Sequence, residues 1–127
     1  MATVKSYTDL GQSKKLAEIL PIESADMGWN VFVDDTTRIL PINDWDLVKD
    51  GSGNVKFYHA WSLAALLELL PKRLEIVDNF YELSVYLYGL YYWNINNGNP
   101  CFESKYKDNL VDACYELILK LHELNLL

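Results

Sequence analysis

The strongest constraint on the fold is an almost uninterrupted apolar segment at residues 61–71. It begins with Trp61, ends with Pro71 and contains five leucines, and only Ser62 and Glu68 are polar. Ser62 is placed to cap a helix N-terminus, and Pro71 cannot continue a helix. Because apolar side chains surround most of such a helix, we predict that it is a buried core helix. It is much too short for a membrane span, which needs about 20 apolar residues.

The length of the chain indicates one soluble domain over residues 1–127, since a chain of 127 residues can bury a sufficient core without disulfides or metals. The net charge of −7 and the pI of about 4.7 argue against binding nucleic acid or an anionic membrane. No basic stretch followed by an apolar run opens the chain, and Cys101 and Cys114 are its two cysteines. We therefore expect a cytoplasmic protein with reduced thiols.

Hydrophobic periodicity predicts three helices and six strands. The helices are expected at 8–20, within 61–71 and at 110–125, and the strands at 29–33, 37–40, 55–59, 73–77, 81–88 and 90–95. We expect Thr8 to cap the first helix, and Asp108 or Asn109 to cap the last. The predicted fold is a single α+β domain, in which three helices pack on one face of a mostly antiparallel sheet in the order α-β-β-β-α-β-β-β-α.

Acidic residues are concentrated between residues 23 and 50, where seven acids and two bases give a local charge of −5. Asp34 and Asp35 are expected in a turn, and Asp44 and Asp46 in a loop. Pairs of carboxylates can bind divalent cations or perform acid–base chemistry, but the EF-hand spacing is absent. We interpret the four as a solvated acidic surface.

An aromatic cluster around Gly89 is the most informative feature for function. Tyr86 and Tyr88 precede this glycine, and Tyr91 and Trp93 follow it on the predicted return strand. Alternation places Tyr86 and Tyr88 opposite the face that carries the leucines and valine of the 81–88 strand. Tyrosine and tryptophan are favoured at protein interfaces, so these four residues form a hypothetical protein-binding surface. The alternatives are that the N-terminal part of the chain covers this face, or that the strand simply tolerates tyrosines because they are good strand formers.

Catalytic motifs are absent from the sequence. His59 and His122 do not form a metal-binding pair, and no phosphate loop or nucleophile elbow is present. Residues 51–54 (Gly-Ser-Gly-Asn) lack the lysine of a phosphate loop and are interpreted as a linker. We predict no metal, no cofactor and no catalytic residue.

Three blocks of sequence resemble a group of small uncharacterised proteins from gut Bacteroidales genomes, their prophages and other mobile elements. The blocks lie at residues 12–16 with 24–27, at 60–67 with 70–71, and at 111–116 with 120–121. The segment from about residue 29 to residue 57 does not take part in the resemblance. The resemblance implies an intracellular accessory protein and no particular mechanism.

Our leading hypothesis is a non-enzymatic protein that binds another protein, or a second copy of itself, and is encoded by a phage or mobile element. The first alternative is an acidic inhibitor that occupies the nucleic-acid-binding site of a host enzyme. The second is an enzyme without a recognised motif, which would need a pocket gathering His59, His122 or the acids.

Overall fold

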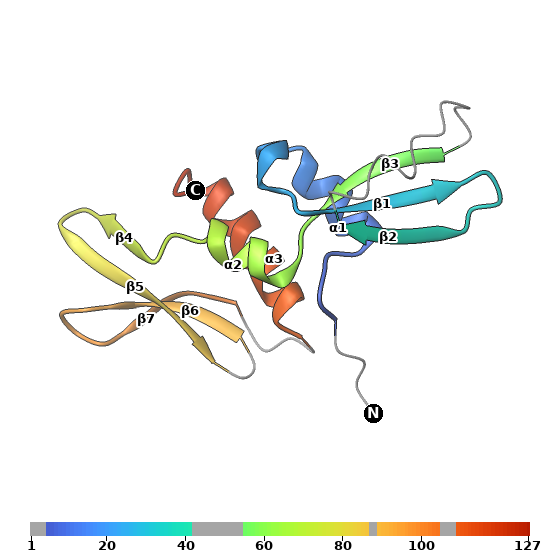
Figure 1. The fold of residues 1–127 in the computed structure, drawn as a ribbon. Coiled ribbons are helices and arrows are strands. Elements are labelled where there is room, and N and C mark those ends of the chain that lie inside the picture. Colours follow the sequence, from blue (N-terminus) through green and yellow to red (C-terminus); the bar gives the residue numbers. More distant parts are fainter. Residues whose placement is uncertain (1–4, 42–54, 87–88, 105–108) are drawn as a thin grey trace. The chain divides into compact units, whose positions relative to one another are not determined.

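A computed structural model of the chain describes residues 5–41, 55–86, 89–104 and 109–127 (Figure 1). Three α-helices, a short 3₁₀ turn and seven strands are present in this part of the chain. In order they are α1 Leu10–Ala17, η1 Ile22–Ser24, β1 Met27–Phe32, β2 Thr37–Pro41, β3 Val55–Ala60, α2 Leu63–Leu69, β4 Arg73–Ile76, β5 Asn79–Tyr86, β6 Gly89–Asn94, β7 Pro100–Ser104 and α3 Leu110–Glu123.

The α+β class and the antiparallel pairing are confirmed, but the expectation of one sheet is not. The strands form a three-stranded sheet, in the order β2-β1-β3, and a four-stranded sheet, in the order β4-β5-β6-β7. The chain divides into two compact units, one spanning Tyr7–Ala65 and the other Leu66–Leu127 with Met1–Ser6. Each sheet lies within one unit. Alternation along a strand indicates which of its faces is buried but not which other strands it pairs with, so the sequence pattern could not reveal two separate sheets. The single domain over 1–127 stays a prediction.

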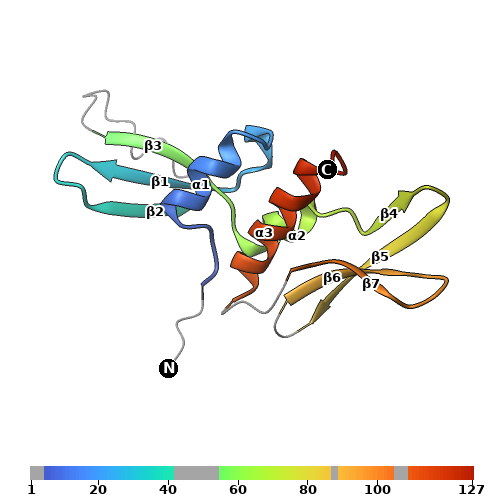
Figure 2. The same cartoon turned by 180° about the vertical axis from the view of Figure 1, so that it is seen from behind.

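The unit Tyr7–Ala65 places α1 on the three-stranded sheet, where the helix contacts β3 (Figure 2). The helix starts at a capping box: Asp9 accepts a bond from the Gln12 amide, at 2.7 Å, and Gln12 accepts one from the Asp9 amide. Asp9 is thus the cap, and the prediction of Thr8 was wrong by one residue. Thr8 is instead buried completely and bonds to Trp61.

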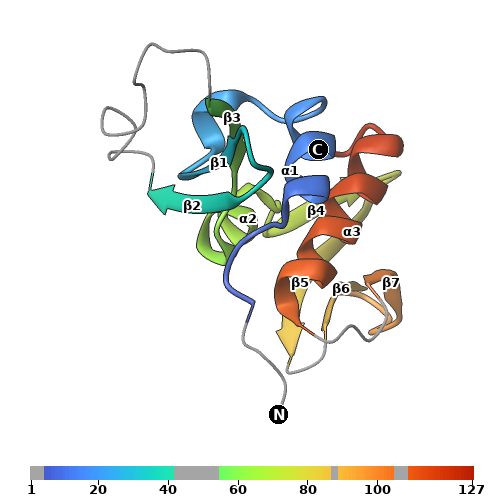
Figure 3. The same ribbon diagram turned by 90° about the vertical axis from the view of Figure 1, so that its right-hand side faces the viewer.

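The four-stranded sheet has one buried face, which lies toward the last helix. Helix α3 contacts β6 and β7 (Figure 3). Asn109 caps it, as expected, by accepting a bond from the Asp112 amide at 2.8 Å. Leu74, Leu90 and Tyr92 share one face of the sheet and are at most 6% exposed. This face and the apolar side of α3 form the core of the unit.

Helix α2 is less buried than its composition predicts. Ser62 caps it as expected, since its Oγ accepts a bond from the Ala65 amide at 3.2 Å. Leu66 is the one buried residue within the helix, whereas Ala64 is exposed and Leu67 is half-buried. The expectation of a helix buried all round was therefore wrong. Only one stripe of this helix packs against a neighbour. The apolar side chains outside that stripe are therefore half-buried or exposed.

Strand β7 was absent from the sequence prediction. It is short, it begins at a proline, and Phe102 has a positive φ of 51°. Its pairing with β6 shifts register between Leu90 and Tyr92, as at a β-bulge. A strand with this irregularity lacks the alternation by which strands are recognised.

Candidate protein-binding surfaces

The pairing of β5 with β6 brings three of the predicted aromatic residues to one face of the sheet. Ser84 is opposite Tyr91, Glu82 is opposite Trp93, and Tyr86 is opposite Gly89. Directly paired residues point to the same face, so Tyr86, Tyr91 and Trp93 lie together on it. Tyr88, the fourth predicted residue, lies outside the described residues.

Phe80 belongs to the same face, because it is two residues before Glu82 on β5. The sequence analysis did not include Phe80 in the predicted surface. We call Phe80, Tyr86, Tyr91 and Trp93 the aromatic face. Phe80 is 40% and Tyr86 42% exposed, whereas Tyr91 and Trp93 are half-buried. The rings of Tyr86 and Tyr91 meet edge to face, with their centres 5.6 Å apart. This contact holds two large side chains against each other at the surface.

An ion pair borders the aromatic face. Arg73 of β4 lies opposite Glu82, and its Nη2 donates to the Glu82 carboxylate at 2.9 Å. The Arg73 guanidinium also lies over the Phe80 ring, 5.9 Å from its centre. The two opposite charges leave this part of the face without a net charge.

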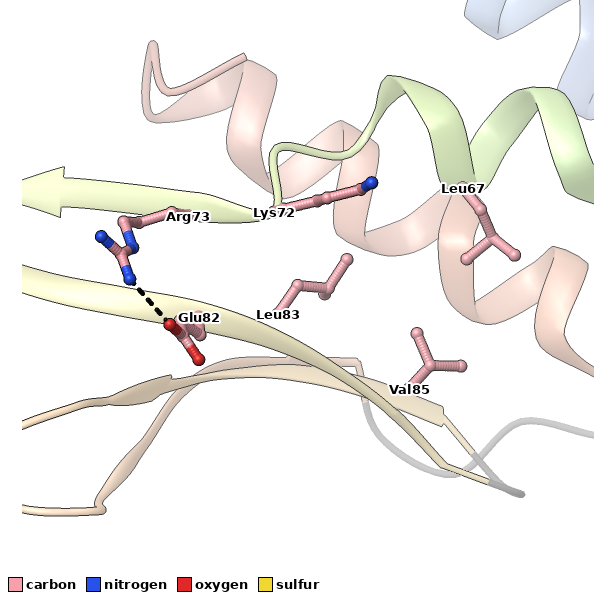
Figure 4. A pocket seen from close by; sticks show the side chains of 6 residues that line it. All are labelled: Leu67, Lys72, Arg73, Glu82, Leu83 and Val85. Atoms are coloured by element: carbon pink, nitrogen blue, oxygen red, sulfur yellow. Dashed lines mark hydrogen bonds and ion pairs between the residues drawn. The ribbon is translucent and has the colours of Figure 1, made fainter.

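The opposite side of β5 borders a cavity of about 570 Å³ that the sequence did not predict. Its lining residues are Leu67 of α2, Lys72, Arg73 of β4, and Glu82, Leu83 and Val85 of β5 (Figure 4). Leu83 and Val85 extend from the strand toward α2, and the Lys72 side chain runs toward Leu67. Val85 is 48% exposed, so the apolar face of β5 is not buried to the end of the strand. We call this cavity the β5–α2 groove.

The acidic residues are only partly placed. Asp34 and Asp35 are exposed in the turn between β1 and β2, as expected. The Asp34 Oδ1 accepts bonds from the Thr36 hydroxyl, at 2.6 Å, and from the Thr36 amide, at 3.1 Å. These bonds lower the pKa of Asp34, because they stabilise the carboxylate. Asp44 and Asp46 lie outside the described residues, so an acidic surface that includes all four residues stays a prediction.

Asp26 has a structural role that the charge pattern concealed. Its Oδ1 accepts a bond from the Ser62 amide at 2.8 Å, and its Oδ2 accepts one from the Ser62 hydroxyl. The carboxylate therefore holds the residue that caps α2. An acid within a highly charged segment gives no sequence signal for such a pairing.

The residues considered for chemistry do not all belong to one unit: His59 belongs to the unit Tyr7–Ala65, and His122, Cys101 and Cys114 belong to the other. His59 packs edge to face on Phe57, with ring centres 5.2 Å apart, and burial lowers its pKa. His122 is exposed on α3. Cys101 and Cys114 are free thiols, and burial raises the pKa of Cys114 to about 12. Within the described ranges, no group of three or more histidine, cysteine, aspartate or glutamate residues is arranged to hold a metal ion.

The fold and these surfaces define an α+β protein with two antiparallel sheets and an exposed aromatic face. Comparison with protein-family models, curated proteins and solved structures finds no match. Over the described residues, no helix is both long enough and apolar enough to span a bilayer.

Proposed function

We propose that this chain is a non-enzymatic accessory protein that binds another protein through the aromatic face. The observation that carries the proposal is the grouping of Phe80, Tyr86, Tyr91 and Trp93 on one side of β5 and β6, with two of the rings 40% exposed or more. Large aromatic side chains contribute most to binding where they are held rigidly and lose water on contact. The Tyr86–Tyr91 ring contact supplies such rigidity.

The charge of the chain favours a protein partner over nucleic acid. Stacked bases on an aromatic sheet need surrounding lysine and arginine residues, whereas the net charge is −7. On the aromatic face itself, Arg73 is already paired with Glu82. The partner that fits is a protein surface with its own apolar centre, on a different protein or on a second copy of this chain.

The resemblance to proteins of gut Bacteroidales and their mobile elements suggests where the partner should be sought. We propose a cytoplasmic location in such a host, and the two free thiols support it. The first experiment is an affinity pull-down from a Bacteroidales lysate at low and high salt, together with sedimentation velocity of the purified protein.

Two variants of the aromatic face serve in this experiment. Tyr91→Ser with Trp93→Ser removes the half-buried pair, and Phe80→Ser with Tyr86→Ser removes the exposed pair. Val33→Ser is the matched control, because Val33 is 76% exposed in the β1–β2 turn. We expect one partner, or a dimer, that persists in high salt and is lost with both aromatic variants but not with the control. Folded aromatic variants that keep every partner would refute the proposal, and a partner removed by salt alone would favour the acidic inhibitor.

A further inference from the structure

We propose that the β5–α2 groove binds the C-terminal segment of a partner protein as an added strand on β5, with its terminal carboxylate beside Lys72. This inference does not depend on the aromatic face, although Arg73 and Glu82 at the rim of the groove also border that face. It starts from the different lengths of β4 and β5. Strand β4 pairs with Asn79–Glu82, and the last bond of this ladder runs from the Leu83 amide to the Lys72 carbonyl, at 3.0 Å.

Beyond that bond, β5 continues as an edge strand. Backbone groups alternate sides along a strand: the Phe80 carbonyl accepts from Ile95 on the β6 side, whereas the Leu83 amide donates to Lys72 on the β4 side. Val85 therefore directs its N–H and C=O to the β4 side, past the start of β4. In the part of the chain that the structure describes, no strand pairs with this side of Val85. Such an edge is a template for another strand.

The side chains beside this edge form an apolar surface that an added strand could contact. Val85 is 48% exposed, and with Leu83 it faces Leu67 of α2 across the groove (Figure 4). A strand added next to Val85 would direct alternate side chains into this space. The cavity of about 570 Å³ is large enough for one or two aliphatic side chains. Backbone bonds to Val85 would thus combine with burial of the Val85 and Leu67 side chains.

The direction of the added strand follows from β4. A segment antiparallel to β5 runs in the same direction as β4, so its C-terminal end approaches Lys72, where β4 begins. Strand β4 itself occupies the line along which the segment would continue, whereas the chain before Lys72 turns toward α2. A partner segment must therefore end or turn at this point. A free C-terminus satisfies this requirement without a turn.

The charge at this end of the groove matches a carboxylate. Lys72 is exposed and forms no ion pair with any described residue, whereas Arg73 is paired with Glu82 at the same rim. Among the described residues, Lys72 is thus the one cation of the groove without an ion-pair partner, in a chain whose net charge is −7. A terminal carboxylate beside Lys72 would form a charge-assisted hydrogen bond.

The test uses a bead-bound library of random hexapeptides with free C-terminal carboxylates, and the same library amidated. The full-length protein should retain free-carboxylate peptides that share an apolar C-terminal residue, and should not retain their amidated counterparts. Two variants locate the site. Val85→Pro removes the edge N–H at a position where proline is tolerated, and Lys72→Glu reverses the charge. Each should weaken binding of a selected peptide by about tenfold or more, measured by fluorescence polarisation.

The matched control is Lys56→Glu, which makes the same charge change at an exposed lysine of β3. It should bind the selected peptide as the wild type does, and so should the Tyr91→Ser, Trp93→Ser variant, because the aromatic face is on the other side of β5. Circular dichroism checks that each variant is folded. If Val85→Pro is unfolded, the binding measured for Lys72→Glu decides whether the proposal holds. The proposal is overturned if neither library is retained, if amidated peptides bind equally well, or if folded Lys72→Glu binds undiminished.

Discussion

Thr8 and Trp61 are 53 positions apart in the sequence and exchange two hydrogen bonds. The Thr8 amide donates to the Trp61 carbonyl at 2.9 Å, and the Trp61 amide donates to the Thr8 hydroxyl oxygen at 3.1 Å. The Ser13 hydroxyl donates its one hydrogen to the Asp9 carbonyl, so the Thr8 hydroxyl must donate to Ser13. Thr8 thus links the start of α1 to the residue before the α2 cap.

Replacing Thr8 by valine should destabilise the protein by about 1–3 kcal/mol, because the buried Trp61 amide loses its acceptor. Valine keeps the shape of threonine, so the change isolates the hydroxyl. Thr37→Val is the matched control, since Thr37 is an exposed residue of β2. Urea unfolding of both variants measures the difference, and equal midpoints would show that the hydroxyl does not stabilise the fold.

A second stability prediction concerns Tyr92, which is fully buried and donates its hydroxyl to the Pro71 carbonyl at 2.6 Å. Burial raises the pKa of this tyrosine well above its usual value, because the phenolate would be poorly solvated. Tyr92→Phe should cost about 1–2 kcal/mol, since the carbonyl is left without its partner. Tyr91→Phe makes the same change on the opposite face and should cost less. Thermal unfolding of the two variants tests this ranking.

The local structure of this chain follows largely from its sequence. The β1–β2 hairpin, the cap at Ser62, the cap at Asn109 and the antiparallel β5–β6 pair were all expected from turn residues, capping residues and alternation. These features depend on neighbours within a few positions. Their energetic causes are therefore contained in short segments that can be analysed one at a time.

The features that sequence reasoning missed depend on distant partners. The alternation in β5 was visible, but the end of the β4 ladder at Lys72 was not, so the exposed edge at Val85 escaped notice. The aromatic face was identified from Tyr86, Tyr91 and Trp93, whereas Phe80 joined it only once the register was known. Separate sheets were missed because strand pairing across a chain is decided by tertiary packing and not by local propensity.

Asp26 provides a third prediction, because its carboxylate accepts bonds from both the amide and the hydroxyl of Ser62. Asp26→Ala should destabilise the protein by about 1–3 kcal/mol, as expected for the loss of hydrogen bonds to a charged group. Glu68→Ala also removes one negative charge, from an exposed position on α2, and serves as the control. If both variants unfold at the same denaturant concentration, the loss of charge and not the bond to Ser62 explains the effect.

The fourth prediction concerns the titration of Asp34. Its pKa lies below the ordinary value because the Thr36 hydroxyl and then the Thr36 amide donate to the carboxylate. Thr36→Val removes the larger of these causes, so the carboxyl signal should titrate at a higher pH in an NMR experiment. Since the folded pKa is the lower one, the stabilisation is present above the unfolded pKa of about 3.9 and is lost as the pH falls through the folded pKa. A variant with an unchanged midpoint would show that the Thr36 amide alone determines the shift, and that the hydroxyl bond contributes nothing to the acid stability of the β1–β2 turn.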